Sequence, residues 1–132
     1  AAKKASQVTE VTTVQNSAAT ASTDEVTLLA AIIQCEAGNE IYEGQVAVGA
    51  VVMNRVKSPA YPGSIYGVIY SSGQFTPAMS GKVARVYEGN IPDACIQAAQ
   101  AAINGETSVG GATYFRRAGR HDGYVIGDHV FW

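Results

Sequence analysis

The feature that most constrains the fold of this chain is an apolar stretch at residues 26–37 that carries one acidic residue near its end. Its apolar side chains recur at helical spacing and cover most of a helix surface: Val26, Leu28, Leu29, Ile32, Ile33, Cys35 and Ala37. Ser22 and Glu25 stand three residues apart, as in a capping box, and Gly38 is a natural stop. The pattern predicts a helix over residues 22–37 that is buried on most sides.

A second apolar segment follows the break at Gly38. It predicts a helix over residues 40–57, with Asn39 as its cap and the end before Ser58-Pro59. The small residues Ala47, Gly49 and Ala50 would let this helix pack closely against the first one.

The rest of the chain predicts shorter elements. A short helix is expected at residues 64–70, and a helix between Pro92 and Gly105. Between them lies a polar loop, residues 71–81, whose Phe75 and Met79 indicate anchoring or a groove wall. Residues 112–117 and 124–131 predict two strands around a polar turn at 118–123. The expected fold class is therefore α+β, mainly helical, with a C-terminal β-hairpin.

Length and composition favour one globular domain. The chain has 132 residues, of which 47% are hydrophobic and 15% charged. Residues 1–22 contain no aromatic side chain and are expected to be a linker or tail. Residues 23–132 are expected to form the domain.

Several classes of function conflict with the composition. The net charge is −2, and the cluster of Arg116, Arg117 and Arg120 is too small to indicate nucleic acid as a partner. The longest apolar run, residues 46–53, is too short to span a membrane. Two histidines and two cysteines are too few for a zinc site, and no phosphate-binding loop is present, so we expect no metal or cofactor. Cys35 and Cys95 are expected as buried thiols in preference to a disulfide.

Glu36 is the residue that most requires explanation. It follows an almost wholly apolar run in the last turn of the predicted helix. The helix C-terminus and the loss of water near apolar side chains both disfavour a carboxylate anion. Both effects would raise the pKa of Glu36, as a general acid requires. The alternative is an ordinary surface or capping glutamate at a frayed helix end.

Glu43 is the candidate for a second carboxylate. A glycosidase that uses two carboxyl groups needs them roughly 5–10 Å apart, and Glu36 with Glu43 is the plausible pair by sequence. Glu40 is more simply explained as an acid in the first turn of the second helix.

Four block matches make the chain resemble a known bacterial family. The most specific covers residues 36–48 (EAGNEIYEGQVAV) and 51–56 (VVMNRV). Three weaker blocks follow in the same order: 73–76 (GQFT), 111–115 (GATYF) and 127–132 (GDHVFW). Together they resemble the spore cortex-lytic and cell-wall hydrolase family.

The resemblance implies a compact, lysozyme-superfamily-like catalytic domain. It implies lytic transglycosylase activity on the bond between N-acetylmuramic acid (MurNAc) and N-acetylglucosamine (GlcNAc) in peptidoglycan, with Glu36 at the position of the family's catalytic glutamate. Gln74, Tyr114 and His129 are then candidates for holding sugar rings, together with Glu43. For His129 and most tyrosines, a purely structural role is the alternative. The expected location is extracellular, at the cell wall or spore cortex, and the expected state is a monomer.

Three rival functions remain open from the sequence. The first is simple hydrolysis, with Glu43 positioning a water molecule. The second is a peptidoglycan-binding module that performs no chemistry. The third is a structural wall or spore-coat protein linked through Cys35 or Cys95.

Overall fold

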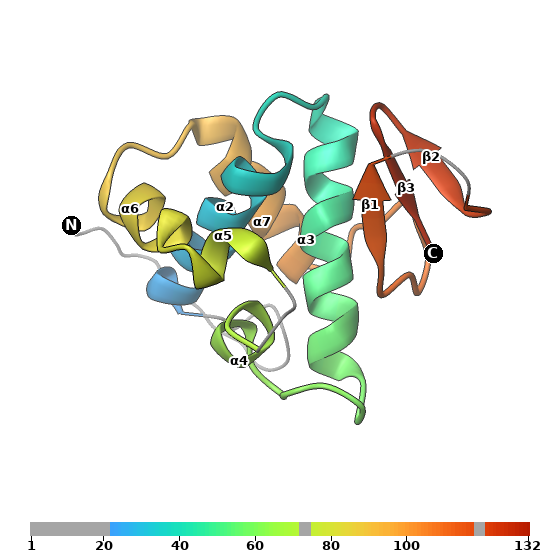
Figure 1. Ribbon diagram of the computed structural model, residues 1–132, viewed down its shortest axis with the longest axis horizontal. Helices are drawn as coiled ribbons and strands as arrows, with labels where there is room; N and C mark the ends of the chain where they lie inside the picture. The colour runs from blue at the N-terminus through green and yellow to red at the C-terminus, as the bar shows by residue number, and fades with distance from the viewer. Residues whose placement is uncertain (1–21, 72–74, 118–120) are drawn as a thin grey trace.

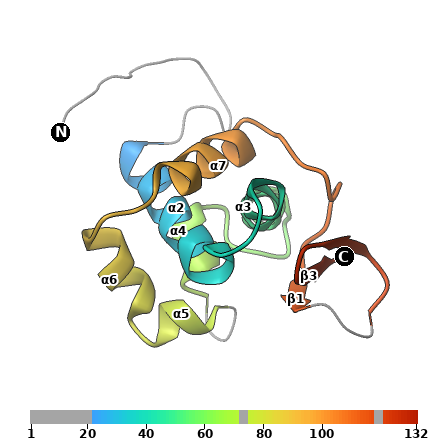
Figure 2. The ribbon, with the colours of Figure 1, turned by 90° about the horizontal axis from the view of Figure 1, so that it is seen from above.

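The computed structural model describes residues 22–71, 75–117 and 121–132, and Figures 1 and 2 show two views of it. Within these ranges the elements are α2 (Thr23–Ala37), α3 (Tyr42–Lys57), α4 (Ile65–Ile69), α5 (Thr76–Met79), α6 (Lys82–Glu88), α7 (Asp93–Ile103), β1 (Phe115–Arg117), β2 (Tyr124–Ile126) and β3 (His129–Phe131). The chain is mainly helical with a small antiparallel sheet, so the predicted fold class is confirmed. Of the predicted linker at 1–22, only Ser22 lies in the described part.

Helix α2 is the centre of the helical layer. The predicted capping box is present, because Ser22 Oγ accepts the Glu25 backbone N–H at 3.2 Å and Glu25 Oε1 accepts the Ser22 backbone N–H at 3.2 Å. The helix packs against α3, α4, α5, α6 and α7, and residues 29–33 are fully buried. It ends at Ala37, with Gly38 as the C-cap.

Helix α3 begins later than predicted. Its N-cap is Ile41, which makes no side-chain capping bond, so the expected cap at Asn39 is wrong. Glu40 consequently lies before the helix, while Glu43 occupies the first turn as expected. The reason is that Glu40 has partners elsewhere, on the C-terminal sheet.

The region predicted as a polar loop contains a helix. Residues 76–79 form α5, which has Pro77 in its first turn, where a proline is favourable. Gly81 then takes a left-handed conformation (φ +83°) and leads into α6, which the sequence reasoning missed. Phe75 is 2% exposed and lines a cavity described below, so it is both an anchor and part of a cavity wall, whereas Met79 is 51% exposed.

The C-terminal strands differ from the predicted hairpin. Residues 124–131 form two strands, and the sheet order is β1-β3-β2. Phe115 pairs with Phe131 between β1 and β3, and Tyr124 pairs with Phe131 between β2 and β3. The break comes at Gly127, whose left-handed conformation (φ +56°) turns the chain between β2 and β3. In both views the sheet lies on the opposite side of α3 from α2 and α6 (Figures 1 and 2).

Polar side chains of α3 attach the segment that leads into β1. The Asn54 side chain donates to the backbone oxygens of Gly110 (3.0 Å) and Ala112 (2.8 Å). Arg55 Nε donates to the Thr113 oxygen at 2.7 Å. The sheet is therefore held beside α3 by directed hydrogen bonds.

Both cysteines are free thiols, which agrees with the preference for thiols over a disulfide. Cys95 is fully buried and its thiol lies 3.3 Å from Gln34 Oε1. Cys35 differs from the expectation because it is only half-buried. In the described part of the chain, no helix has the length and apolar character needed to cross a membrane.

A substitution at Gly49 would test how closely α3 packs against α2 and α7. A Cβ atom at Gly49 would lie 2.8 Å from Ala102 Cβ of α7 and 3.2 Å from Ile33 Cδ1 of α2. Although alanine favours helices over glycine, we expect Gly49→Ala to lower the free energy of unfolding by about 1–3 kcal/mol through overpacking. The matched control is Gly44→Ala in the same helix, where the new Cβ would meet its neighbours at 3.4 and 3.5 Å. Urea denaturation of both variants measures the difference, and equal stabilities would contradict the packing argument.

Candidate active site

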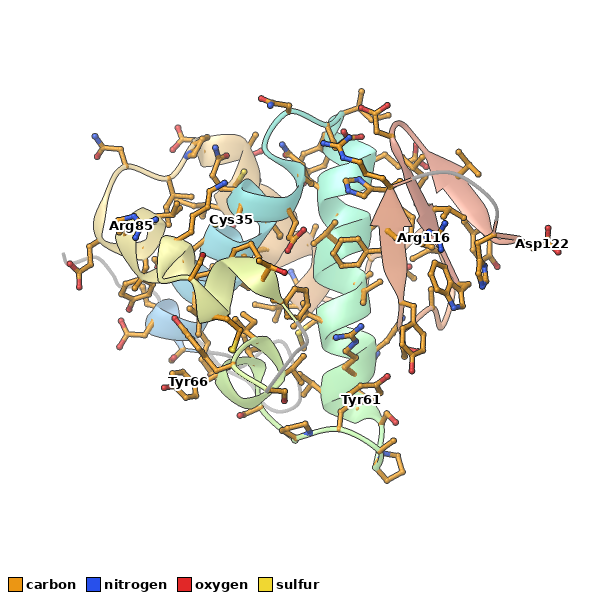
Figure 3. The ribbon with its side chains drawn as sticks, in the orientation of Figure 1. Cys35, Tyr61, Tyr66, Arg85, Arg116 and Asp122 are labelled. Atoms are coloured by element: carbon orange, nitrogen blue, oxygen red, sulfur yellow. The ribbon has the colours of Figure 1, made fainter. Side chains whose placement is uncertain are left out.

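Two adjoining cavities lie where the end of α2 meets the sheet. The first, about 340 Å³, is lined by Cys35, Glu36, Arg55, Phe75, Thr76, Phe115, Arg116, Arg117 and His129. The second, about 250 Å³, is lined by residues 34–40 together with Lys82, Val86, Arg117 and His129. Cys35 and Arg116 both line the first cavity, and Figure 3 shows that they come from different elements, α2 and β1. Glu36 lines both cavities, and so lies where they meet.

Glu36 has the electrostatic character that its position in the sequence predicts. Its side chain is half-buried in the last turn of α2. Burial raises the pKa of Glu36 above its ordinary value, and the positive charge of Lys82 partly opposes this rise. A carboxyl group with a raised pKa at the junction of two cavities can hold a proton and release it to a bound molecule.

Arg55 and the rings of Phe75 and Phe115 line the first cavity. The Arg55 side chain is 4% exposed, and its guanidinium carbon lies 5.2–5.5 Å from the ring centres of Tyr61, Phe75 and Tyr114. Burial lowers the pKa of Arg55, but an arginine stays charged in proteins. The first cavity therefore combines the positive charges of Arg55, Arg116 and Arg117 with the rings of Phe75 and Phe115.

Glu40 and His129 form a buried pair beside Glu36. Glu40 Oε1 accepts the Asp128 backbone N–H at 3.0 Å and lies 3.9 Å from His129 Nδ1. The Nδ1 atom is buried without a hydrogen-bond partner in the structure. Burial lowers the pKa of His129, while the carboxylate of Glu40 acts in the opposite direction. His129 lines both cavities, so the Glu40 carboxylate lies beside a ring that a bound molecule would meet.

The other predicted site residues do not line the two cavities in the described part of the chain. Glu43 is exposed in the first turn of α3 and is not among the residues that line either cavity, so the structure does not bring it to Glu36. Tyr114 also lies outside the lining, but it contacts Arg55 and stacks on Trp132 with ring centres 5.7 Å apart. A hydrogen bond with Tyr61 raises the pKa of Tyr114. Gln74 lies outside the described residues.

The sequence did not reveal several residues that share the cavities with Glu36. They are Glu40, Arg55, Lys82, Phe115, Arg116 and Arg117. For Arg55 a signal existed, because a charged residue interrupts the apolar run of α3 at a buried position. Lys82, Phe115, Arg116 and Arg117 depend on contacts between segments far apart in the chain, which no local pattern reveals. Glu40 lies close to Glu36 in the sequence but was interpreted as an acid at a helix start. Among the described residues, no three His, Cys, Asp or Glu side chains are grouped so as to hold a metal ion.

Comparison with known proteins decides the family. The sequence profile described as Cell Wall Hydrolase matches residues 39–132. The chain belongs to this cell wall hydrolase family. The match begins three residues after Glu36, so the role of Glu36 rests on the geometry above and on the resemblance.

Curated relatives and solved structures agree with this assignment. A spore cortex-lytic enzyme of Halalkalibacterium halodurans is 36% identical over 94 residues, 71% of this chain and 27% of the relative. A spore cortex-lytic enzyme of Bacillus subtilis is 44% identical over 62 residues, 47% of this chain and 20% of the relative. The cell wall hydrolase domain therefore spans only about a quarter of the length of these relatives.

The fold is that of known catalytic domains. The catalytic domain of the Bacillus cereus SleB protein superposes with a TM-score of 0.73 at 30% identity, covering 83% of this chain and 90% of that one. The catalytic domain of the germination-specific lytic transglycosylase SleB from Bacillus anthracis gives a TM-score of 0.74 at 29% identity, covering 85% and 96%. The predicted family and fold are both confirmed.

The raised pKa of Glu36 predicts a pH-dependent stability. The folded protein binds this proton more tightly than the unfolded chain does. This tighter binding stabilises the folded state. The contribution is complete at pH values below the ordinary carboxyl pKa, and it is lost as the pH rises from there through the raised pKa of Glu36. We therefore expect Glu36→Gln to gain stability over the native protein as the pH rises through this window. Thermal melts from pH 4 to 8 measure the gain. Glu43→Gln is the exposed control, and an equal gain there would contradict the assignment to Glu36.

The Glu40–His129 contact makes a second prediction. Removing the negative charge in Glu40→Gln should lower the pKa of His129 further, because the carboxylate of Glu40 favours the charged imidazole. An NMR titration of the His129 ring protons measures this shift, with His121 as an internal reference. An unchanged or higher pKa of His129 would show that Glu40 does not act on the ring.

Proposed function

We propose that this cell wall hydrolase domain is a lytic transglycosylase that cleaves the MurNAc–GlcNAc bond of peptidoglycan and leaves a 1,6-anhydro-MurNAc end. The observation that carries the proposal is the half-buried carboxyl group of Glu36, with its raised pKa, at the junction of two cavities. A glycan strand lying through both cavities would place a glycosidic bond beside Glu36. The similarity to a protein described as a germination-specific lytic transglycosylase supports the same chemistry.

The proposed mechanism needs one carboxyl group. Protonated Glu36 donates its proton to the glycosidic oxygen as the bond from C1 of MurNAc to that oxygen breaks, and the bonding electrons leave with the oxygen. Positive charge then develops on the MurNAc ring. The Glu36 carboxylate next takes the proton of the 6-hydroxyl group while O6 forms a bond to C1. Because this nucleophile belongs to the same sugar, it is already in place.

The surroundings of Glu36 suit a group that first donates a proton and then accepts one. The rings of Phe75 and Phe115 line the first cavity, with centres 6.2 Å apart, and offer apolar surface to a sugar ring. His129, with the Glu40 carboxylate 3.9 Å from its Nδ1 atom, is a contact for the sugar in either cavity. Tyr114 remains a candidate for a more distant sugar ring, through its exposed stack on Trp132.

Hydrolysis is the alternative chemistry, and the geometry gives it less support. Glu43, the expected second carboxylate, is not part of the cavity lining. Glu40 does line the second cavity, but it is engaged with Asp128 and His129. We therefore favour the reaction with an internal nucleophile over one in which a second carboxylate activates water. The site of action would be extracellular, at the cell wall or spore cortex, as the names of the relatives suggest.

Mass spectrometry of digested peptidoglycan tests this function. Native protein should release fragments with 1,6-anhydro-MurNAc ends, and Glu36→Gln should reduce the rate by roughly 100-fold or more, as expected for loss of the general acid. Glu43→Gln should retain the native rate. Reducing MurNAc ends would establish hydrolysis instead. Equal release by native protein and Glu36→Gln would refute the role of Glu36, and binding without any cleavage would favour a binding module.

A further inference from the structure

The positive charges of this acidic chain are concentrated at the candidate site. The chain has a net charge of −2, with nine Lys and Arg residues against eleven Asp and Glu residues. Four of these nine line the two cavities: Arg55, Lys82, Arg116 and Arg117. The carboxyl groups in the lining are Glu36, whose pKa is raised, and Glu40, which is engaged with Asp128 and His129. The cavities are therefore electropositive although the chain as a whole is not.

Three of the four cations are exposed, and we call them the basic rim: Lys82, Arg116 and Arg117. Arg116 and Arg117 follow each other on β1, so their side chains point to opposite faces of the sheet, and Arg117 shares the face of its pairing partner His129. Lys82 begins α6. Arg117 lies 4.0 Å from Asp128, but the two side chains are 82% and 73% exposed, and an ion pair of this kind is weak. Arg55 is different, since it is buried and donates to the Thr113 oxygen.

The charges of the basic rim act on the pKa values of Glu36 and His129. Lys82 opposes the rise in the pKa of Glu36, and Arg117 contributes to the lowered pKa of His129. Lys82 comes from α6 and the arginines from β1, so positive charge flanks Glu36 from both the helical side and the sheet side. A neutral polysaccharide would gain little from such an arrangement.

We propose that the basic rim is an anion subsite that binds the carboxylates of the glycan strand next to the bond that is cleaved. This proposal rests on the function proposed above, and it assigns the rim a task that Glu36 and the rings do not perform. Guanidinium groups suit this task because they bind carboxylates through two parallel hydrogen bonds. Peptidoglycan carries carboxylates on its stem peptides and, where the peptide is removed, on the lactyl group of each MurNAc. A β-1,4-linked GlcNAc polymer carries none, so the rim selects peptidoglycan over chitin-like glycans.

Binding by an uncleaving protein tests the subsite. The background variant is Glu36→Gln, and the probes are three glycans of equal length: peptide-bearing peptidoglycan fragments, the same strands without peptides, and chitin oligosaccharides. In this background, Arg116→Gln with Arg117→Gln should weaken binding of the peptide-bearing strand about tenfold and flatten its salt dependence. Binding of chitin oligosaccharides should not change. The lactyl carboxyl group is an amide in the peptide-bearing strand, so an equal loss of affinity for both strands means that the rim binds either carboxylate. A smaller loss for the peptide-free strand assigns the stem peptide as the ligand.

A matched variant controls for general charge. Lys57→Gln removes one exposed positive charge at the end of α3, and Lys57 does not line either cavity. It should leave all three affinities unchanged. An equal loss on chitin oligosaccharides, or no loss on any glycan, would overturn the anion subsite. Because binding is measured without cleavage, these outcomes are independent of whether the native protein forms 1,6-anhydro ends.

Discussion

The burial of α2 determines where a reactive carboxyl group can stand in this fold. Five consecutive residues, 29–33, are fully buried because α3, α4, α5, α6 and α7 all pack against the helix. The last turn leaves this enclosure at the edge of the sheet, where the two cavities begin. Glu36 is thus carried on a rigid helix into a partly desolvated position. The burial that stabilises the helix also raises the pKa of Glu36.

The sheet completes the site through polar contacts. Asn54 and Arg55 of α3 bind the chain ahead of β1, and Glu40 binds the turn between β2 and β3. A side chain at Gly127 would collide with the Glu40 carboxylate, so the turn and the acid fit together closely. Directed hydrogen bonds fix position and orientation more narrowly than apolar contacts do. This suits a wall that brings His129 and Arg117 to the cavities that Glu36 also lines.

The sequence was sufficient for the features that depend on local periodicity. The spacing of apolar residues and the Ser22–Glu25 capping box predicted α2, and the unusual place of Glu36 within it identified the main candidate. The same reasoning failed where distant partners decide the structure. Glu40 was assigned to a helix start because acids are favourable there, but its hydrogen bond to Asp128 lies 88 residues away in sequence. The pairing of β1 with β3, and with it the place of Arg116, depends on the turn at Gly127.

The basic rim and the acid also influence each other. Lys82 holds the pKa of Glu36 below the value that burial alone would give. In the proposed complex, a substrate carboxylate next to the rim would offset part of this positive charge. The pKa of Glu36 would then rise, because the cation that favours its ionised form is partly neutralised. Binding of an anionic strand would thereby favour the protonated form of Glu36, the form that the first step of the proposed reaction needs, whereas a neutral glycan would not.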